Sequence, residues 1–367
     1  MPADVLVIGG GVAGGAVAAY LARAGRHVVV IERKSGPHDK VCGEFVSGEA
    51  AQYLRDLDID LEGLGAVRIT TVRIYARHQM VTASLRFPAF SLSRRALDEA
   101  LLRTASKYGA ELRRGHSVRS LRPLGGQWVA ELDHGRNFLA GGSFLATGKH
   151  DVRGWRRPPG KQNDFIGFKL HWRVVAAQAA ALSSYVELFV FPGGYAGLSL
   201  VENGIANLCL VIRRHSFERL DNSWEALLTT LRADFLALHQ RLSGAEPCSD
   251  RPLAIASIPY GYVQSRNTGP WCIGDQAAVI PSFSGDGIAI ALHSARLGAE
   301  YYLAGKANSE FQARLARDVT GQVRVATLLS RVLVKRWGQD AIMGAARVAP
   351  RLISDIADLT RIPNDRL

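Results

Sequence analysis

The N-terminal residues alternate between short apolar runs and a glycine-rich turn. Residues 4–8 (DVLVI) form an apolar run that is typical of a strand buried on both faces. Residues 16–24 have helical composition, and Gly25 ends that helix. Residues 27–31 form a second apolar run, which Glu32 follows. The pattern predicts a strand–turn–helix–strand unit.

Glycines occupy the turn at the positions that a dinucleotide fingerprint requires. Gly9 permits a tight turn, Gly11 lets the backbone approach a pyrophosphate, and Gly14 allows close packing of helix on strand. The N-terminus of the helix offers free N–H groups to that pyrophosphate, and an acid at the end of the next strand suits ribose hydroxyls. The predicted dinucleotide contacts are Gly9, Gly11, Ala13, Gly14, Glu32 and Arg33.

In the middle of the chain, apolar and polar residues alternate as they do in strands that have one exposed face. Residues 68–75 and 82–87 alternate in this way, and so do residues 187–190 and 208–212. These segments predict a second, mixed or antiparallel sheet.

The C-terminal region has helical periodicity. Apolar residues recur at spacings of three or four at Val323, Ala326, Leu329, Val332, Leu333 and Trp337. Basic residues lie among them, namely Arg324, Arg331, Lys335 and Arg336. The pattern predicts one amphipathic helix, which either packs on the body with its arginines in water or lies on an anionic membrane.

A second glycine-rich block follows an apolar stretch at residues 271–273. Asp275 stands where an acid at a strand end suits a polyol hydroxyl, and the turn before residues 289–303 opens a helix towards an anion. This block resembles the C-terminal signature of the FAD-dependent oxidoreductases that include p-hydroxybenzoate hydroxylase and geranylgeranyl reductase. The matching positions are Gly274, Asp275, Ala277, Pro281, Gly285, Gly287 and Ile288.

The resemblance implies non-covalent FAD. Asp275 would bind the ribityl chain, and the amides around Gly287 and Ile288 would face the pyrimidine edge of the flavin. In the block that runs from residue 93 to 101, Arg94 would lie near the FAD phosphates. The strand at Val118 would meet the adenine.

Cys42 lies in a Lys-x-Cys-Gly segment that resembles geranylgeranyl-reductase-like proteins. The resemblance implies that this loop passes beside the isoalloxazine ring, with Cys42 facing the substrate. The alternative is a small buried side chain, which is how most free cysteines behave. Tyr195 likewise has two possible roles, one in lining the substrate pocket and one in filling the core. His171 and His293 are further candidate proton donors.

At three places the sequence departs from the family pattern, and these departures reduce the number of reaction types that the resemblance implies. Thr147 stands where aromatic hydroxylases carry an acid, which weakens hydroxylase-type NADPH handling. Gly197 stands where geranylgeranyl reductases carry a Trp, so an isoprenoid substrate is not implied. The Trp-x-Trp-x-Ile-Pro segment of flavin halogenases is absent from the sequence, which disfavours halogenation.

The net charge and the cysteine spacing bear on nucleic-acid binding, metal binding and cellular location. The chain of 367 residues has a net charge of +12, but it contains no run of four basic residues and no aromatic–basic interleaving. No specific nucleic-acid partner is therefore expected. The four cysteines form no Cys-x-x-Cys pair, so we expect no metal site and a cytoplasmic, reducing location.

Together these features predict an α/β flavoprotein with a Rossmann-like parallel sheet, a mixed or antiparallel substrate sheet and a helical tail. The expected parts are a discontinuous FAD-binding domain at 1–70, 91–160 and 250–305, a substrate sheet at 71–90 and 161–249, and a helical region at 306–367. The favoured function is reduction of a C=C bond in a small apolar or lipid- or polyketide-like substrate, with NAD(P)H or a reduced carrier as donor. A monooxygenase that uses NAD(P)H and oxygen is the alternative, and a basic flavoprotein that binds RNA or a protein partner is the third hypothesis.

Overall fold

The computed structural model describes residues 3–348, 354–355 and 358–362. Within the expected C-terminal region 306–367, residues 349–353, 356–357 and 363–367 lie outside the described residues. Within the described residues, no helix combines the length and the hydropathy that crossing a bilayer requires.

The first sheet is the predicted parallel sheet with a hairpin added at one edge. Its strand order is β6-β2-β1-β9-β8-β7, and β17 pairs with the end of β9. The pairs among β6, β2, β1, β9 and β17 are parallel, whereas β7, β8 and β9 pair antiparallel. The strands are β1 (Ala3–Ile8), β2 (Val28–Glu32), β6 (Glu111–Arg114), β7 (Val118–Leu124), β8 (Gln127–Leu132), β9 (Asn137–Leu145) and β17 (Trp271–Cys272).

Burial explains the apolar composition of the central strands. Val5 of β1 pairs with Val28 of β2, and Ile8 pairs with Ile31. All four side chains are buried because helices cover the sheet, which is the usual condition for parallel strands. The helices of this part are α1 (Val12–Arg23), α2 (Gly48–Asp56), α3 (Arg94–Lys107) and α8 (Gly287–Leu303).

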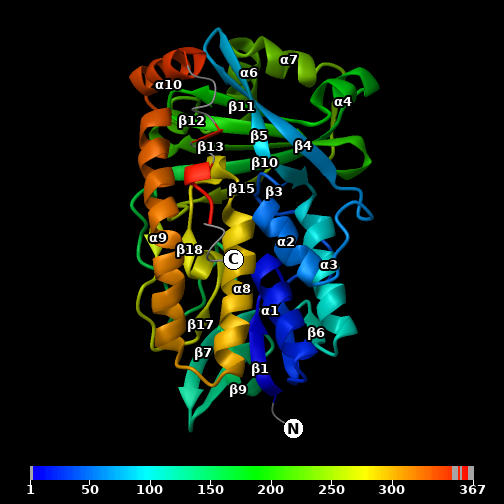
Figure 1. The fold of residues 1–367 in the computed structure, drawn as a ribbon, viewed down its shortest axis with the longest axis vertical. Helices are drawn as coiled ribbons and strands as arrows, with labels where there is room; N and C mark the ends of the chain where they lie inside the picture. The colour runs from blue at the N-terminus through cyan, green and yellow to red at the C-terminus, as the bar shows by residue number, and fades with distance from the viewer. Residues whose placement is uncertain (1–2, 349–353, 356–357, 363–367) are drawn as a thin grey trace.

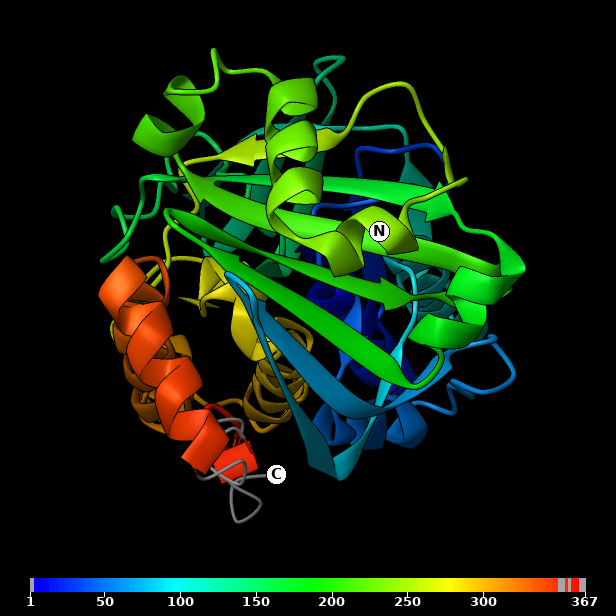
Figure 2. The same ribbon diagram turned by 90° about the horizontal axis from the view of Figure 1, so that it is seen from above.

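The second sheet lies above the first in Figure 1, and Figure 2 looks down on it. Its order is β14-β10-β13-β12-β11-β4-β5-β3, with β15 paired to β10, and only β4 and β11 run parallel. The strands are β3 (Phe45–Val46), β4 (Val67–Ala76), β5 (Gln79–Ser91), β10 (Phe165–Arg173), β11 (Tyr185–Phe191), β12 (Gly194–Leu200), β13 (Ile205–Arg213), β14 (Glu246–Pro247) and β15 (Leu253–Ala256). The domain boundaries remain a proposal, and β3 and β15 belong to this sheet although their residues fall in ranges proposed for FAD binding.

Helices lie over the outer face of the second sheet (Figure 2). Leu227, Leu231 and Leu238 of this layer pack in one apolar cluster with Phe189 of β11. The other face of the second sheet is turned towards the first sheet. The helices are α4 (Ala176–Leu182), α5 (Arg214–Glu218), α6 (Trp224–Asp234) and α7 (Leu236–Arg241), and a separate two-stranded ribbon pairs β16 (Tyr262–Val263) with β18 (Ala278–Val279).

The C-terminal region forms two long helices rather than one across the predicted stretch. They are α9 (Asn308–Leu333) and α10 (Arg336–Val348). The prediction that Trp337 continues the apolar face of one helix was wrong, because Trp337 lies in α10 and is 61% exposed. The chain turns at Val334, whose carbonyl accepts a hydrogen bond from the N–H of Gly193 at 2.9 Å and whose side chain is buried.

Candidate active site

A cavity of about 650 Å³ lies between the two sheets. Its lower wall consists of loops that follow β1, β2 and β9 at the carboxyl edge of the first sheet, which is where open α/β sheets bind ligands. Its upper wall includes Cys209 and Val211 of β13 and residues 253–255 of β15.

The turn between β1 and α1 forms one end of the cavity. Gly9 has a φ of +102°, which L side chains rarely adopt. A Cβ on Gly14 would lie 1.8 Å from the carbonyl oxygen of Gly9, so only glycine lets the helix approach the turn. Gly11 begins α1 without a side-chain cap, which leaves the first N–H groups available to a ligand. Gly9, Gly11 and Ala13 line the cavity, and Gly14 packs beneath them.

Two cations converge on the same turn. A Cβ on Gly11 would lie 3.2 Å from Nζ of Lys40 and 3.3 Å from Nη2 of Arg94. Both cations bind Asp98, each with its nearest nitrogen 2.8 Å from a carboxylate oxygen. Burial raises the pKa of Asp98, but the charges of Arg94 and Lys40 outweigh burial and hold it below its usual range. Two cations against one carboxylate leave positive charge beside the helix N-terminus, which suits a pyrophosphate.

Glu32 sits next to this turn with its carboxylate fixed by the backbone. Its oxygens accept hydrogen bonds at 2.8 and 2.9 Å from the N–H groups of Gly10 and Lys34. Each carboxylate oxygen keeps a further lone pair for a ribose hydroxyl. Arg33 and Val118 line the same end of the cavity, as the predicted ribose and adenine contacts require.

The opposite end is built around the start of α8. Asp275 lines it, with Nζ of Lys149 3.7 Å from its carboxylate. Gly285 has a φ of +78°, and a Cβ there would lie 2.7 Å from the ring of Phe45. No atom lies within 4 Å of the place where Gly287 would carry a Cβ, so this end is open to a planar ring. Gly274 and Ile288 also line the cavity, and Pro281 lies between the lining residues Ile280 and Ser282.

A buried acid stands between those two glycines. Asp286 is 1% exposed, and Nη1 of Arg361 lies 4.0 Å from its carboxylate. The same Nη1 lies 2.5 Å from Glu49, and the guanidinium stacks on the ring of Phe87. Burial raises the pKa of Asp286 to about 7, and Arg361 offsets only part of that rise. One cation from the C-terminal segment therefore faces two carboxylates at the start of α8.

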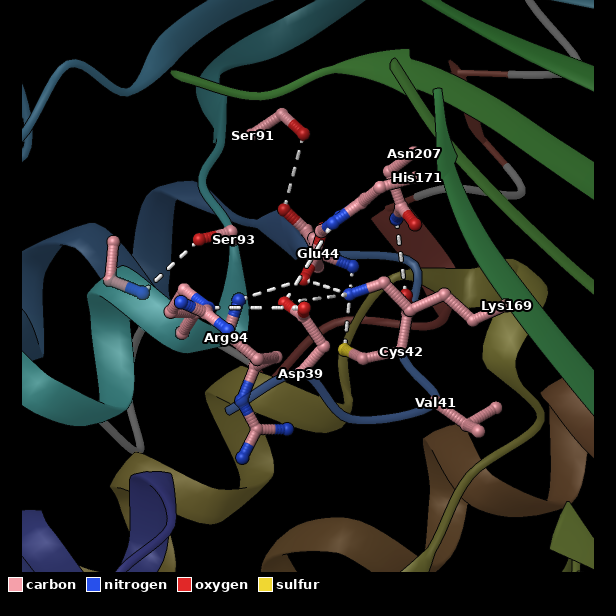
Figure 3. Close-up of polar contacts among 12 residues, drawn as sticks. Asp39, Val41, Cys42, Glu44, Ser91, Ser93, Arg94, Lys169, His171 and Asn207 are labelled. Carbon is pink, nitrogen blue, oxygen red and sulfur yellow. Dashed lines mark hydrogen bonds and ion pairs between the residues drawn. The ribbon is translucent and has the colours of Figure 1, made fainter. Parts of the chain in front are cut away.

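Figure 3 shows a second cluster of polar residues, centred on Glu44, which itself lines the cavity. Its carboxylate accepts hydrogen bonds from the N–H of Arg94 at 2.8 Å, from Nε2 of His171 at 2.8 Å, and from Nζ of Lys169. Burial raises the pKa of Glu44, but His171 and Lys169 outweigh burial and lower it. Asp39 lies 3.7 Å from His171 and 3.9 Å from Lys169. The ammonium supplies the positive charge that a metal ion would otherwise bring to these acids.

Glu44 also fixes the position of Cys42. The N–H of Glu44 donates to Sγ of Cys42 at 3.3 Å, and the amide of Asn207 donates to the Cys42 carbonyl at 3.1 Å. The guanidinium of Arg94 interacts with the same sulfur. Cys209 lines the cavity as well, and burial raises its pKa to about 12, so it stays a neutral thiol. The structure thus places Cys42 in the cavity wall, next to the cation that borders Gly11.

Tyr195 occupies a less direct position than predicted for a substrate contact. Its hydroxyl hydrogen-bonds Oγ of Ser282 at 2.9 Å, and Tyr260 shares the same partner at 2.8 Å. Ser282 and Tyr260 line the cavity, but Tyr195 is not among the described residues that do so. Burial raises the pKa of Tyr195 to about 12. His293 lies apart from the cavity lining, bound to the hydroxyl of Tyr53 at 2.8 Å.

Comparison with known proteins agrees with this geometry. Residues 1–83 match the family model described as pyridine nucleotide-disulphide oxidoreductase. The chain is 29% identical over 329 residues to a menaquinone reductase of Mycolicibacterium smegmatis, which covers 83% of this chain and 77% of that protein. A menaquinone reductase of Mycobacterium tuberculosis is 28% identical over 328 residues, or 81% of this chain and 76% of that protein.

Solved structures share the whole fold. The flavin-dependent brominase Bmp2 superposes with a TM-score of 0.81 at 18% identity, over 98% of this chain and 93% of that chain. A probable FAD-dependent monooxygenase from Pseudomonas aeruginosa, pqsL, superposes with a TM-score of 0.73 at 15% identity, over 94% of this chain and 100% of that chain. Together these similarities support an FAD-dependent oxidoreductase superfamily for this chain.

The residues that line the cavity suit the successive parts of FAD. The cations at Gly11 suit the pyrophosphate, the fixed carboxylate of Glu32 suits the ribose, and the open space at Gly287 suits the isoalloxazine. Sequence reasoning did not identify Lys40, which lies beside Gly11, although a lysine two residues before Cys42 was the available signal. It also missed Lys169 and Arg361, whose partners are remote in the sequence.

Two glycine variants separate cofactor binding from folding. Gly11→Val should keep the fold and lose FAD, because the new side chain approaches only flexible cation ends but fills the pyrophosphate position. Gly14→Ala should destabilise the protein strongly, because its Cβ meets backbone. The measurements are flavin content and the melting temperature of the apoprotein. Full flavin content in Gly11→Val would contradict the assignment.

Asp286→Asn tests the buried acid through pH. Because the pKa of Asp286 rises from 3.8 unfolded to about 7 folded, its contribution to stability is complete below about pH 4 and is lost as the pH rises towards 7. The melting temperature of Asp286→Asn relative to the native protein should therefore increase between about pH 4 and 7 and stay constant above. A difference that does not change with pH would show that Asp286 is ionised throughout.

Proposed function

We propose that this flavoprotein reduces a C=C bond of an apolar, lipid- or polyketide-like substrate, with non-covalent FAD as cofactor. The observation that carries the proposal is the thiol of Cys42 in the cavity wall, held by Glu44 and Arg94 beside an apolar roof. The menaquinone reductases that match most of the chain favour the same class of reaction.

FAD would be held by the residues that line the cavity. Its pyrophosphate would lie at Gly11 between Lys40 and Arg94, its ribose at Glu32, and its ribityl chain at Asp275. Bound there in its reduced form, FAD would supply a hydride for one carbon of the double bond. The protein then has to supply a proton to the other carbon and to exclude water.

Cys42 is the proposed proton donor. The N–H of Glu44 points at its sulfur at 3.3 Å, and the guanidinium of Arg94 lies beside it, so the thiol is held in one position towards the cavity. Glu44 itself is a poor donor, because its neighbours lower its pKa. Asp39, with 31% of its side chain exposed, and His171 form a line of polar groups from solvent to the Glu44 carboxylate.

The roof of the cavity favours an apolar substrate. Val211 and residues 253–255 line it, together with Ile258 and Tyr260. Apart from Tyr260, these side chains offer no hydrogen-bonding group, so binding relies on burial of apolar surface, at about 25 cal/mol for each Å². Ser282, which two tyrosine hydroxyls orient, is a polar contact available to a substrate oxygen.

A monooxygenase remains the alternative, and the fold shared with pqsL is compatible with it. In that reaction the same cavity would hold an aromatic or enolic substrate, with NAD(P)H and oxygen as co-substrates. Thr147, which replaces the acid of aromatic hydroxylases, argues against it.

Product analysis tests the reaction class. The FAD-loaded protein is reduced without oxygen by NADH, NADPH or dithionite in turn and is mixed with a polyprenylated quinone in heavy water. A reductase adds two hydrogens to carbon. With dithionite as donor both are solvent deuterium, because the N–H hydrogens of a reduced flavin come from the solvent, and mass spectrometry detects them. A product that forms only in air and gains one oxygen would establish the monooxygenase instead.

Cys42→Ala should leave FAD content near normal and slow the oxidation of the reduced protein by substrate about 100-fold or more, the range of general acid catalysis. Cys248→Ala, at an exposed thiol, is the matched control and should behave like the native protein. Single-turnover kinetics, flavin content and melting temperature are measured together. A loss of about 1 kcal/mol of stability with an unchanged rate would show that Cys42 only fills space.

A further inference from the structure

The outer face of α9 carries an unusual combination of exposed residues. Arg324, Leu328, Arg331 and Lys335 follow one another at spacings of three or four, so they lie along one side of the helix and its end. All four are exposed, and Leu328 is 62% exposed. Trp337, at the start of α10, is 61% exposed. We call these residues and Arg336 the α9–α10 patch.

The positive charge of the α9–α10 patch is not neutralised by any described acidic residue. Among the described residues, no carboxylate lies within ion-pair distance of its four cations Arg324, Arg331, Lys335 and Arg336. Asp340, the next acid along α10, lies 3.1 Å from Arg77, so its charge is already compensated. The patch therefore attracts anions over roughly a Debye length, about 8 Å at physiological salt.

Two apolar side chains set the patch apart from an ordinary solvated helix. Leu328 lies between Arg324 and Arg331 on the helix, and the ammonium of Lys335 lies 5.8 Å from the ring centre of Trp337. Tryptophan favours the boundary between lipid headgroups and acyl chains. A single-stranded nucleic acid would use the cations and could stack a base on Trp337, but it has no use for Leu328, whereas a bilayer uses the cations and both apolar side chains.

The patch lies behind the wall of the cavity. Val334, between α9 and α10, packs in one buried cluster with Tyr195 and Tyr260, and Tyr260 lines the cavity. The N–H of Gly193, one residue before the strand that carries Tyr195, donates to the Val334 carbonyl at 2.9 Å. One layer of packed side chains thus separates the patch from the apolar end of the cavity.

We propose that the α9–α10 patch docks this protein on an anionic lipid bilayer. The four cations contact lipid phosphates, and Leu328 and Trp337 enter the headgroup region. Docking does not depend on which reaction the flavin site performs. Because each cation contributes separately to attraction by an anionic surface, binding falls steeply when the charges are reversed.

The experiment is co-sedimentation of the FAD-loaded full chain with vesicles. Phosphatidylcholine vesicles are compared with vesicles that also contain phosphatidylglycerol, at low and at raised salt. The test variant is Arg324→Glu/Arg331→Glu. The control is Arg122→Glu/Arg136→Glu, which changes the net charge equally at the β7–β9 end, far from α10 in Figure 1. Flavin content and melting temperature verify that both variants fold.

The native protein and the control should bind only the anionic vesicles, and less so at raised salt. The test variant should bind them at least about 30-fold more weakly, because two cations are lost and two carboxylates are added. Equal binding to both vesicle types, or an equal loss in the control, would overturn the proposal. Displacement of the vesicles by equimolar single-stranded RNA would overturn it in favour of a nucleic-acid surface.

Discussion

The buried carboxylate of Glu44 holds the two halves of the active site together. It accepts hydrogen bonds from the first N–H of α3, below the cavity, and from Lys169 and His171 of β10, above it. Removing a carboxylate from water is costly, and these partners offset that cost only while all are present. Glu44 adopts a φ of +59°, a strained conformation that such over-determined positions tolerate. The placement of Cys42 follows from it, because the Glu44 N–H binds the sulfur.

Charge is distributed unevenly along the cavity, and the distribution matches FAD. At the phosphate end, Lys40 and Arg94 face a single carboxylate, which leaves positive charge for the pyrophosphate. At the flavin end, the N-terminus of α8 provides the positive end of a helix dipole, while burial raises the pKa of Asp286 beside it to about 7, so that about half of this carboxyl is protonated at pH 7. A fully ionised Asp286 would offset more of the positive potential at that helix end. Arg361 therefore connects the C-terminal segment to the electrostatics of the cofactor.

The proposed substrate, the cavity roof and the α9–α10 patch are consistent with one another. An apolar roof requires a substrate that is poorly soluble in water, and a lipid bilayer is where such molecules collect. Val334 joins the roof to the helices that carry the patch. A protein that rests on the bilayer through this patch would take up its substrate without releasing it into water, and it needs no membrane-spanning segment to do so.

The sequence by itself determined the features that depend on local backbone. The turn at Gly9, Gly11 and Gly14, the strands beside it and the glycine block at Gly285 follow from conformations that only nearby residues influence. It could not identify Lys169 as the partner of Glu44, which is 125 residues away, or Arg361 as the partner of Asp286. Those contacts depend on the register of β10 against β13 and on how the C-terminal segment packs beside α8. The break of the C-terminal helix at Val334 was likewise decided by a contact with Gly193, because the periodicity of a helix carries no information about the surface against which it ends.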